Sequence, residues 1–277
     1  MASTTSSAAP QQHYSRNWCK PRLVRHMSIT STFLLLNLST PPGIGKGLVT
    51  AYLAKANTTV IATCREVSEQ ITKDLFSLSR GHGSNLIIVS LSLDKPQSVI
   101  NAVSQLQRHH SINKIDIVIA NAGICIHYGP LARMEDADLV SHFDVNTLGP
   151  IRLFRATLPL LQASSQPKFI YISSELASIT GLERSSSLTS AYGVSKVASN
   201  YLVKKIHTEH PDMIAFSIDP GFVQTDMGNR GAQCNGLEKA PMTISESIEG
   251  IVNQVEKASK ETTSGRFIKH DGEQLPW

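Results

Sequence analysis

The stretch FLLLNLSTPPGIGKGLVTAYL, residues 33–53, decides the fold. An apolar run over Phe33–Leu36 predicts a buried strand, and the periodicity of the apolar residues over 45–56 predicts a helix. Between them lies a glycine turn, residues 39–47. A strand, a glycine turn and a helix in this order are where parallel α/β folds bind nucleotide phosphates.

The same alternation continues along the rest of the chain. Apolar, β-branched runs predict strands, and the stretches between them predict helices. The predicted strands are Thr59–Thr63, Asn85–Leu91, Ile115–Ala120, Lys168–Ile172, Met213–Ile218 and Gly265–Lys269, and the further helices cover 66–80, 96–109, 133–162, 190–209 and 243–260. About seven strands in this pattern predict an α/β fold, a doubly wound Rossmann-type parallel sheet with helices on both faces. Leu176–Ser190 and Gly228–Thr243 are predicted to be loops.

Length and composition favour one large globular domain. The chain has 277 residues, of which 41% are hydrophobic and 17% charged, and we assign residues 32–277 to a single domain. No apolar run reaches the roughly 20 residues of a membrane helix, so we expect no membrane span and a cytoplasmic protein. The cysteines lie far apart, which predicts a reducing compartment and no metal site. They are Cys19, Cys64, Cys125 and Cys234.

Residues 1–31 differ from the rest of the chain in charge. The first acidic residue is Glu66, and the net charge of +4 comes from basic residues before Met27. Because the remaining chain is balanced, its basic pI does not indicate a nucleic-acid partner. We interpret 1–31 as a basic, disordered N-terminal extension. The alternatives are an organelle transit peptide, although no clear amphipathic helix is present, and a natural start at Met27.

The stretch SAYGVSKVASNYL, residues 190–202, carries a candidate for acid–base chemistry. Tyr192 and Lys196 are four residues apart, so they share one face of a helix. A lysine ammonium favours the phenolate and lowers the pKa of a nearby tyrosine, which suits a general acid or base. Taken alone, this spacing is common by chance and a surface pair is the simpler interpretation.

Four further motifs give this pair a context. Ser173 and Ser174 end a predicted strand, where a hydroxyl can hydrogen-bond a substrate oxygen. The stretch IVIANAG, residues 117–123, runs from a strand into a turn of small residues. Asn146 lies inside a predicted helix, where asparagine is disfavoured without a specific reason. Pro220–Gly221 follow the strand that ends near Ile218.

Together these motifs resemble the short-chain dehydrogenases/reductases over about residues 33–277. A glycine turn, Asn-Ala-Gly, a helical asparagine, a serine before Tyr-x-x-x-Lys, and Pro-Gly occur in the order of that family. Within the family, GIGKGLVTAYLAKANTTVIATCR and the ending DGEQLPW are similar to fungal ketoreductases of the norsolorinic acid ketoreductase type. The resemblance implies reduction of a small-molecule ketone or aldehyde to an alcohol, in secondary metabolism.

The resemblance also implies roles for the candidate catalytic residues. Tyr192 would protonate the carbonyl oxygen as general acid, and Lys196 would hold the nicotinamide ribose and lower the Tyr192 pKa. Ser174 would hydrogen-bond the substrate oxygen, with Ser173 as the alternative. Asn146 would anchor a water in a proton relay toward Lys196.

A binding site for NADP(H) is the second implication. Arg65 follows the second strand, where an arginine suits a 2′-phosphate and an acid would suit NAD; the alternative is a solvated side chain at a strand end. Thr225 would contact the cofactor or, equally, cap a helix. The implied cofactor residues are Gly43, Ile44, Gly45, Arg65, Asn121, Gly123, Tyr192, Lys196, Val223 and Thr225.

The phosphate loop departs from the family pattern. Ser39 stands where the family has glycine and resists a positive φ, while Pro41 and Pro42 have no N–H for a phosphate. Three interpretations stay open: a weakened site that still binds NADPH, a catalytically weak or inactive homologue with a binding or regulatory role, or a stretch that does not represent the natural protein. Ser92 stands where the family often has aspartate, and Asp94 is expected to point elsewhere.

The loops and the longest helices complete the prediction. The loops over 176–190 and 228–243 would form the substrate pocket and its lid. Relatives often form homodimers or homotetramers, and the helices over 133–162 and 190–209 are where such contacts are expected.

Overall fold

The computed structural model describes Met1 and residues 31–35, 43–185 and 187–277. The predictions about the N-terminal extension before Ser31, and about the phosphate-loop residues Ser39, Pro41 and Pro42, therefore lie outside the described residues. The glycine turn is described from Gly43 onward.

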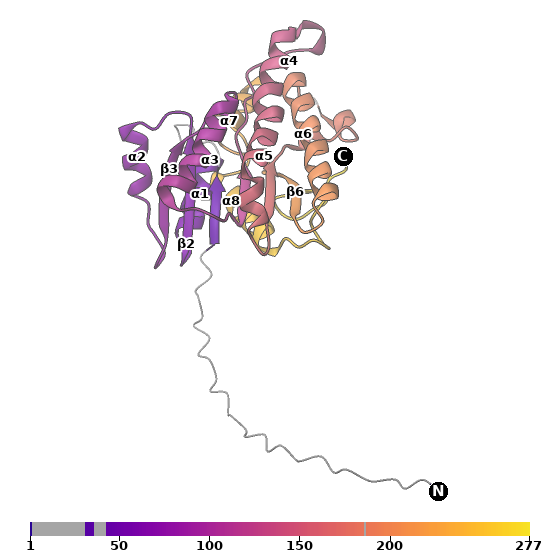
Figure 1. Cartoon of the computed structure of the whole chain (residues 1–277). Coiled ribbons are helices and arrows are strands. Elements are labelled where there is room, and N and C mark those ends of the chain that lie inside the picture. Colours follow the sequence, from indigo (N-terminus) through magenta and orange to yellow (C-terminus); the bar gives the residue numbers. More distant parts are fainter. Residues whose placement is uncertain (2–30, 36–42, 186) are drawn as a thin grey trace.

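Within the described residues, seven parallel strands form one sheet in the order β3-β2-β1-β4-β5-β6-β7 (Figure 1). The chain adds β2 and β3 on one side of β1 and then continues on the other side with β4, so its winding reverses between β1 and β4. The α/β class with a parallel sheet is confirmed. The strands are β1 (Ser31–Leu35), β2 (Thr58–Cys64), β3 (Asn85–Ser90), β4 (Ile117–Ala120), β5 (Lys168–Ile172), β6 (Ile214–Asp219) and β7 (Phe267–Lys269).

Helices cover both faces of this sheet. Residues of α3, α5 and α6 pack on one face and residues of α1, α2 and α8 on the other. Val118 contributes to the first core and Ile119 to the second, as expected for alternating side chains. Burial on both faces explains why the strands are mostly apolar and show no strict alternation of apolar and polar residues. The helices are α1 (Ile44–Leu53), α2 (Glu69–Phe76), α3 (Pro96–His110), α4 (Asp136–Phe143), α5 (Gly149–Gln162), α6 (Ser190–Glu209), α7 (Asp226–Cys234) and α8 (Ile244–Lys257).

A glycine fixes the position of α1 over the sheet. A Cβ atom on Gly47 would lie 2.6 Å from Cγ1 of Ile248 in α8, which is closer than a side chain allows. A side chain at residue 47 would therefore force Ile248 or one of the two helices to shift.

The helix predicted over 133–162 is bent by a wider turn. After α4, the residues Asp144–Leu148 form a π-helical turn, which leads directly into α5. Asn146 lies in this turn and is buried. Single π turns inside helices often occur at functional sites, and the hydrogen bonds of Asn146 described below show what this one positions.

The loop prediction for Gly228–Thr243 was wrong at its start, because α7 extends to Cys234. This helix is short and contains glycines, so its periodicity is weak. The alternative role given to Thr225 is confirmed: its hydroxyl caps α7 by accepting a hydrogen bond from the Gly228 amide at 3.1 Å. The other predicted loop contains two short 3₁₀ turns, Glu175–Ala177 and Leu182–Arg184.

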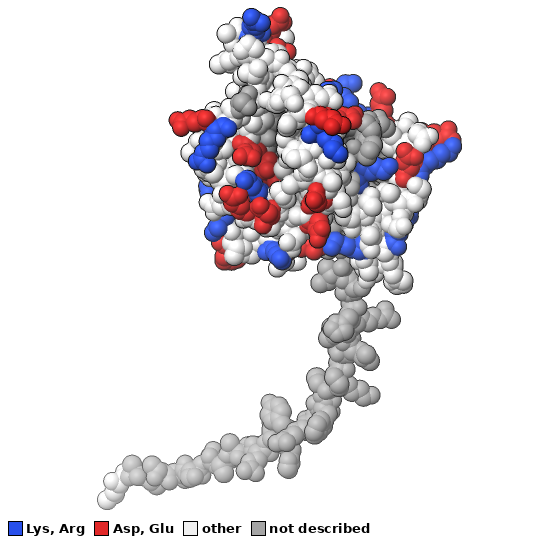
Figure 2. All heavy atoms as spheres, turned by 180° about the vertical axis from the view of Figure 1, so that it is seen from behind, with Lys and Arg blue, Asp and Glu red and all other residues white. Residues whose placement is uncertain are grey.

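The charged side chains are mixed over the surface. Figure 2 shows acidic and basic groups interspersed on the face seen from behind. None of the helices in the described part of the chain is both long enough and apolar enough to cross a membrane.

Candidate functional site

A cavity of about 900 Å³ lies at the carboxyl ends of the strands. Its walls include the residues that follow β4, β5 and β6, so the reversal of winding near β1 opens onto it. Every predicted site residue except Asn146 lines this cavity: Gly43, Ile44, Gly45, Arg65, Asn121, Gly123, Ser174, Tyr192, Lys196, Val223 and Thr225. The sequence motifs therefore meet in one place.

Tyr192 lies in the first turn of α6 and is 9% exposed. Burial raises the pKa of its phenol well above the usual value, and a hydrogen bond with Ser174 acts in the opposite direction. The lowering of this pKa that the sequence predicted from Lys196 is not observed, because desolvation dominates. A proton on Tyr192 is thus held firmly until another group stabilises the phenolate.

The two neighbouring serines have different environments. Ser173 is 2% exposed, and its hydroxyl donates a hydrogen bond to Oδ1 of Asn200 at 2.8 Å. Ser174 is only half-buried and accepts a hydrogen bond from the Leu176 amide at 3.3 Å. Since Ser173 is occupied by a structural contact, the geometry favours Ser174 as the serine that faces a ligand.

Lys196 is buried beside Tyr192 in the floor of the cavity. Its Nζ donates a hydrogen bond to the carbonyl oxygen of Ile172 at 2.8 Å and lies 4.6 Å from the centre of the Tyr171 ring. Burial lowers the pKa of this ammonium to about 7, although Cys125 and Asp219 act to raise it. The ammonium therefore loses its proton close to neutral pH.

Asp219 is a buried residue of the cavity lining that the sequence reasoning did not single out. Its carboxylate is 4% exposed and accepts hydrogen bonds from the amides of Glu175 at 2.7 Å and Gly221 at 3.1 Å. Burial raises the pKa of this carboxyl, while both amides lower it. Asp219 thereby links the turn that carries Ser174 to the Pro-Gly turn after β6.

Asn146 uses its whole side chain within the protein. Its Oδ1 accepts a hydrogen bond from the Ile124 amide at 2.8 Å, and its Nδ2 donates to Ile124 O and to Ser195 Oγ, both at 2.9 Å. A Cβ on Gly123 would lie 3.2 Å from Asn146 Oδ1 and 3.4 Å from Lys196 Nζ. Glycine at 123 therefore leaves room for the side-chain amide of Asn146 and the ammonium of Lys196 next to the Asn-Ala-Gly turn.

The N-terminus of α1 also faces the cavity. Gly43 precedes the helix in an extended conformation, without a side-chain cap, and the first turn contains no acidic residue. The first N–H groups of a helix have no partner within it and attract anions. Gly43, Ile44 and Gly45 thus present backbone donors to the cavity, and Arg65 lines the same region directly after β2.

Asp94, which was expected to point elsewhere, is among the residues that line the cavity. Its carboxylate accepts a hydrogen bond from Ser92 Oγ.

Two further segments line the cavity. Leu176 and Leu182 come from the first predicted loop, and Arg230 and Leu237 come from the segment after β6. Both predicted loops therefore contribute to the cavity. Among the described residues, no group of three or more His, Cys, Asp or Glu side chains is arranged to hold a metal ion.

Comparisons with known proteins place this geometry in context. The model of the short chain dehydrogenase family matches residues 40–234. The norsolorinic acid ketoreductase of Aspergillus parasiticus is 43% identical over 238 residues, 85% of this chain and 88% of that protein. The norsolorinic acid ketoreductase of Dothistroma septosporum is 41% identical over 251 residues, 89% of this chain and 92% of that protein. The NADPH-bound carbonyl reductase from chicken fatty liver has a TM-score of 0.78 at 27% identity, covering 90% of this chain and 99% of that one.

Proposed function

Because this chain belongs to the short chain dehydrogenase family, we propose that it is an NADPH-dependent oxidoreductase that reduces a ketone or aldehyde carbonyl to an alcohol. The resemblance predicted from the motifs is confirmed by the family match and by the named ketoreductases. One observation carries the proposal. A single cavity joins Ser174, Tyr192 and Lys196 to the N-terminus of α1 and to Arg65.

The residues along this cavity fit a dinucleotide. The uncapped N-terminus of α1 would offer N–H groups to the pyrophosphate, and Arg65, which lines the same cavity, would bind the 2′-phosphate. Lys196 has spent one of its three ammonium donors on Ile172, which leaves donors for the ribose hydroxyls. Asn121 and Gly123 would border the adenosine ribose, while Val223 and Thr225 would contact the carboxamide and phosphate side.

We assign the proton transfer to the residues at the end of β5 and the start of α6. When bound, NADPH supplies the hydride. Tyr192 donates the proton to the carbonyl oxygen, and Ser174 donates a hydrogen bond that orients this oxygen and stabilises its developing charge. The charge on Lys196 stabilises the phenolate left on Tyr192, which burial alone would disfavour. Asn146 supports this arrangement by holding the turn beside Lys196, and we propose it for the proton relay.

The substrate is proposed to be a medium-to-large, apolar or aromatic carbonyl compound of secondary metabolism. The named fungal relatives support this class of substrate. Apolar residues such as Leu176, Leu182 and Leu237 line the cavity. Residues 32–277 are proposed as the catalytic domain.

Titration of the purified protein with NADPH tests the proposal directly. We expect enhanced nicotinamide fluorescence on binding, followed by NADPH oxidation when a panel of aromatic and aliphatic ketones and aldehydes is added. Binding without oxidation of NADPH by any carbonyl would favour the inactive homologue. No binding at millimolar cofactor would contradict the proposal and support the interpretation that the phosphate loop is defective.

Replacing Arg65 by alanine is expected to weaken NADPH binding about ten- to hundredfold, since a hydrogen bond to a charged group contributes about 1.5–3 kcal/mol. NADH, which lacks the 2′-phosphate, should bind with nearly unchanged affinity. Fluorescence titration with both nucleotides measures the difference. Arg155→Ala, an exposed arginine of α5, controls for the loss of a positive charge. Equal effects of Arg65→Ala on NADPH and NADH would contradict the assignment.

A further inference from the structure

One wall of the cavity is the segment Ile124–Tyr128, which follows the Asn-Ala-Gly turn; we call it the β4 wall. Ile124, Cys125, Ile126 and Tyr128 line the cavity. The segment has no regular secondary structure of its own, so its position depends on what its backbone amides bind. Asn146 holds the first residue through the two hydrogen bonds to Ile124 described above.

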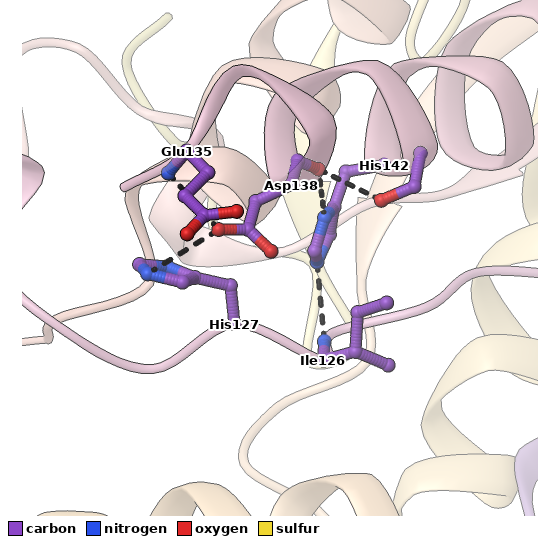
Figure 3. Close-up of polar contacts among 6 residues, drawn as sticks. Ile126, His127, Glu135, Asp138 and His142 are labelled. Carbon is purple, nitrogen blue, oxygen red and sulfur yellow. Dashed lines mark hydrogen bonds and ion pairs between the residues drawn. The ribbon is translucent and has the colours of Figure 1, made fainter. Parts of the chain in front are cut away.

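A second anchor comes from a buried histidine in α4. The Ile126 amide donates a hydrogen bond to Nε2 of His142 at 3.1 Å, and Nδ1 of the same ring lies 2.6 Å from the carbonyl oxygen of Asp138 (Figure 3). An amide can only donate and a carbonyl can only accept, so Nδ1 carries the proton and Nε2 does not. His142 is 0% exposed. The ring is therefore neutral in this arrangement and is fully used by two backbone groups.

The two anchors belong to one continuous helical segment. His142 and Asn146 are four residues apart, and they bind residues 124 and 126, which are two apart on the wall. At its far end, the wall is tied to the pocket loop, because the Gly129 amide donates to the carbonyl oxygen of Leu188 at 2.8 Å. For the backbone amides of Ile124–Tyr128, the only hydrogen bonds among the described residues are those to Asn146 and His142.

The ionisable groups near His142 contact the start of α4 and do not contact the His142 ring with their side chains. Asp138 and Glu135 form a capping box, and Nε2 of His127 lies 3.7 Å from Oδ2 of Asp138 (Figure 3). His127 itself does not line the cavity. His127 belongs to the wall, but its ring contacts Asp138 at the start of α4, whereas the Ile126 amide is bound by His142. His127→Gln is therefore a control that removes an imidazole and keeps the acceptor for that amide.

We propose that His142 is a positioning residue for substrate binding: it fixes the β4 wall at Ile126, so that Ile126 and Tyr128 form a defined surface for the bulky part of the carbonyl substrate. This rests on the proposed function for its kinetic consequence. Ile126 and Tyr128 line the cavity and are not among the residues assigned to the cofactor or to proton transfer. Loosening the wall therefore raises KM for bulky carbonyls and leaves the proton donor and the NADPH site intact.

The test compares three replacements at one position. His142→Gln retains an acceptor oxygen at about the reach of Nε2, whereas His142→Asn is shorter and reaches only as far as Nδ1. His142→Leu has no acceptor. Hydrogen exchange of the peptide that contains the Ile126 amide, followed by mass spectrometry, needs no substrate. We expect faster exchange in the Leu and Asn variants, and nearly wild-type exchange in the Gln variant and in the control His127→Gln.

Kinetics complete the test. For the bulky planar probe phenanthrenequinone, KM should rise about five- to tenfold in His142→Leu, as expected for a lost hydrogen bond of about 1 kcal/mol. For the small probe para-nitrobenzaldehyde, KM and kcat of His142→Leu should stay within about twofold of wild type. His142→Gln should have a KM for phenanthrenequinone close to that of wild type. NADPH affinity should be unchanged throughout.

Each outcome has a distinct meaning. Unchanged exchange at Ile126 in folded His142→Leu overturns the anchor, whatever the activity. Faster exchange with equal losses for both probes and for NADPH would mean a general structural role and would overturn the assignment to substrate positioning. If His142→Leu does not fold, the comparison of His142→Asn with His142→Gln decides. If no carbonyl compound in the panel causes the wild type to oxidise NADPH, the proposed function fails and the kinetic part of this test fails with it. The exchange result still decides whether His142 anchors the wall.

Discussion

Tyr192→Phe is expected to lower kcat for carbonyl reduction about a hundred- to ten-thousandfold, the usual contribution of a positioned general acid. Phenylalanine keeps the ring in its buried position in α6 but has no proton to give. Tyr192 is 9% exposed, so little water reaches this position to replace the phenol as donor. The measurement is carbonyl-dependent NADPH oxidation under saturating cofactor.

Two controls separate chemistry from binding. NADPH titration of Tyr192→Phe should give an affinity within about threefold of wild type, because the phenol is one contact among many. Tyr201→Phe removes a hydroxyl from an exposed tyrosine of the same helix and should leave kcat unchanged. If Tyr192→Phe retains more than a tenth of wild-type kcat, Tyr192 is not the acid.

Asp219→Asn is expected to cost about ten- to hundredfold in kcat, since hydrogen bonds to a charged group contribute about 1.5–3 kcal/mol. Asparagine keeps one acceptor oxygen, but its NH₂ group would meet the second backbone amide. The substitution therefore loosens the link between the Ser174 turn and the Pro-Gly turn. It also removes the carboxylate that helps to keep Lys196 protonated.

The pH profile of Asp219→Asn gives a second readout. The protonated Lys196 is the active form in our proposal, so kcat should fall as pH rises through the Lys196 pKa, which is about 7 in this structure. A nearby negative charge raises the pKa of an ammonium, so removal of the Asp219 charge lowers it. The falling limb should move to lower pH. Asp226→Asn, which removes an exposed carboxylate from the same cavity, should leave the limb in place.

Much of the fold follows from the sequence because it depends on local patterns. Strands buried on both faces are mostly apolar, as in β4, whose residues Ile117–Ala120 are all apolar and buried. The spacing of Tyr192 and Lys196 likewise follows from helix geometry. The π turn around Asn146 and the short helix α7 were not predicted, since tertiary contacts and a cap at Thr225 determine them rather than periodicity.

The supporting residues of the site were beyond sequence reasoning for a different reason. Asp219 and His142 act on backbone groups that are distant in the chain, and only the folded chain brings these partners together. One signal was available for Asp219, since it ends a strand directly before Pro-Gly, as Ser174 ends another strand. The role of Lys196 was predicted from chemistry, but the dominance of burial over charge for the Tyr192 pKa required the three-dimensional structure.

The π turn at Asp144–Leu148 limits how this protein can vary in length. A π turn takes up one extra residue between helical turns that keep their register, so deleting one residue there would restore ordinary α-helical pairing and remove the wide turn. Asn146 would then lose the position from which it binds Ile124, although the other side chains of the site remained in the sequence. Insertions and deletions should therefore be tolerated in the pocket loops, where they can alter the choice of substrate, and rejected in this helix. New substrate specificities should therefore arise through changes of length in the pocket loops, while the length of the helical segment with the π turn is kept.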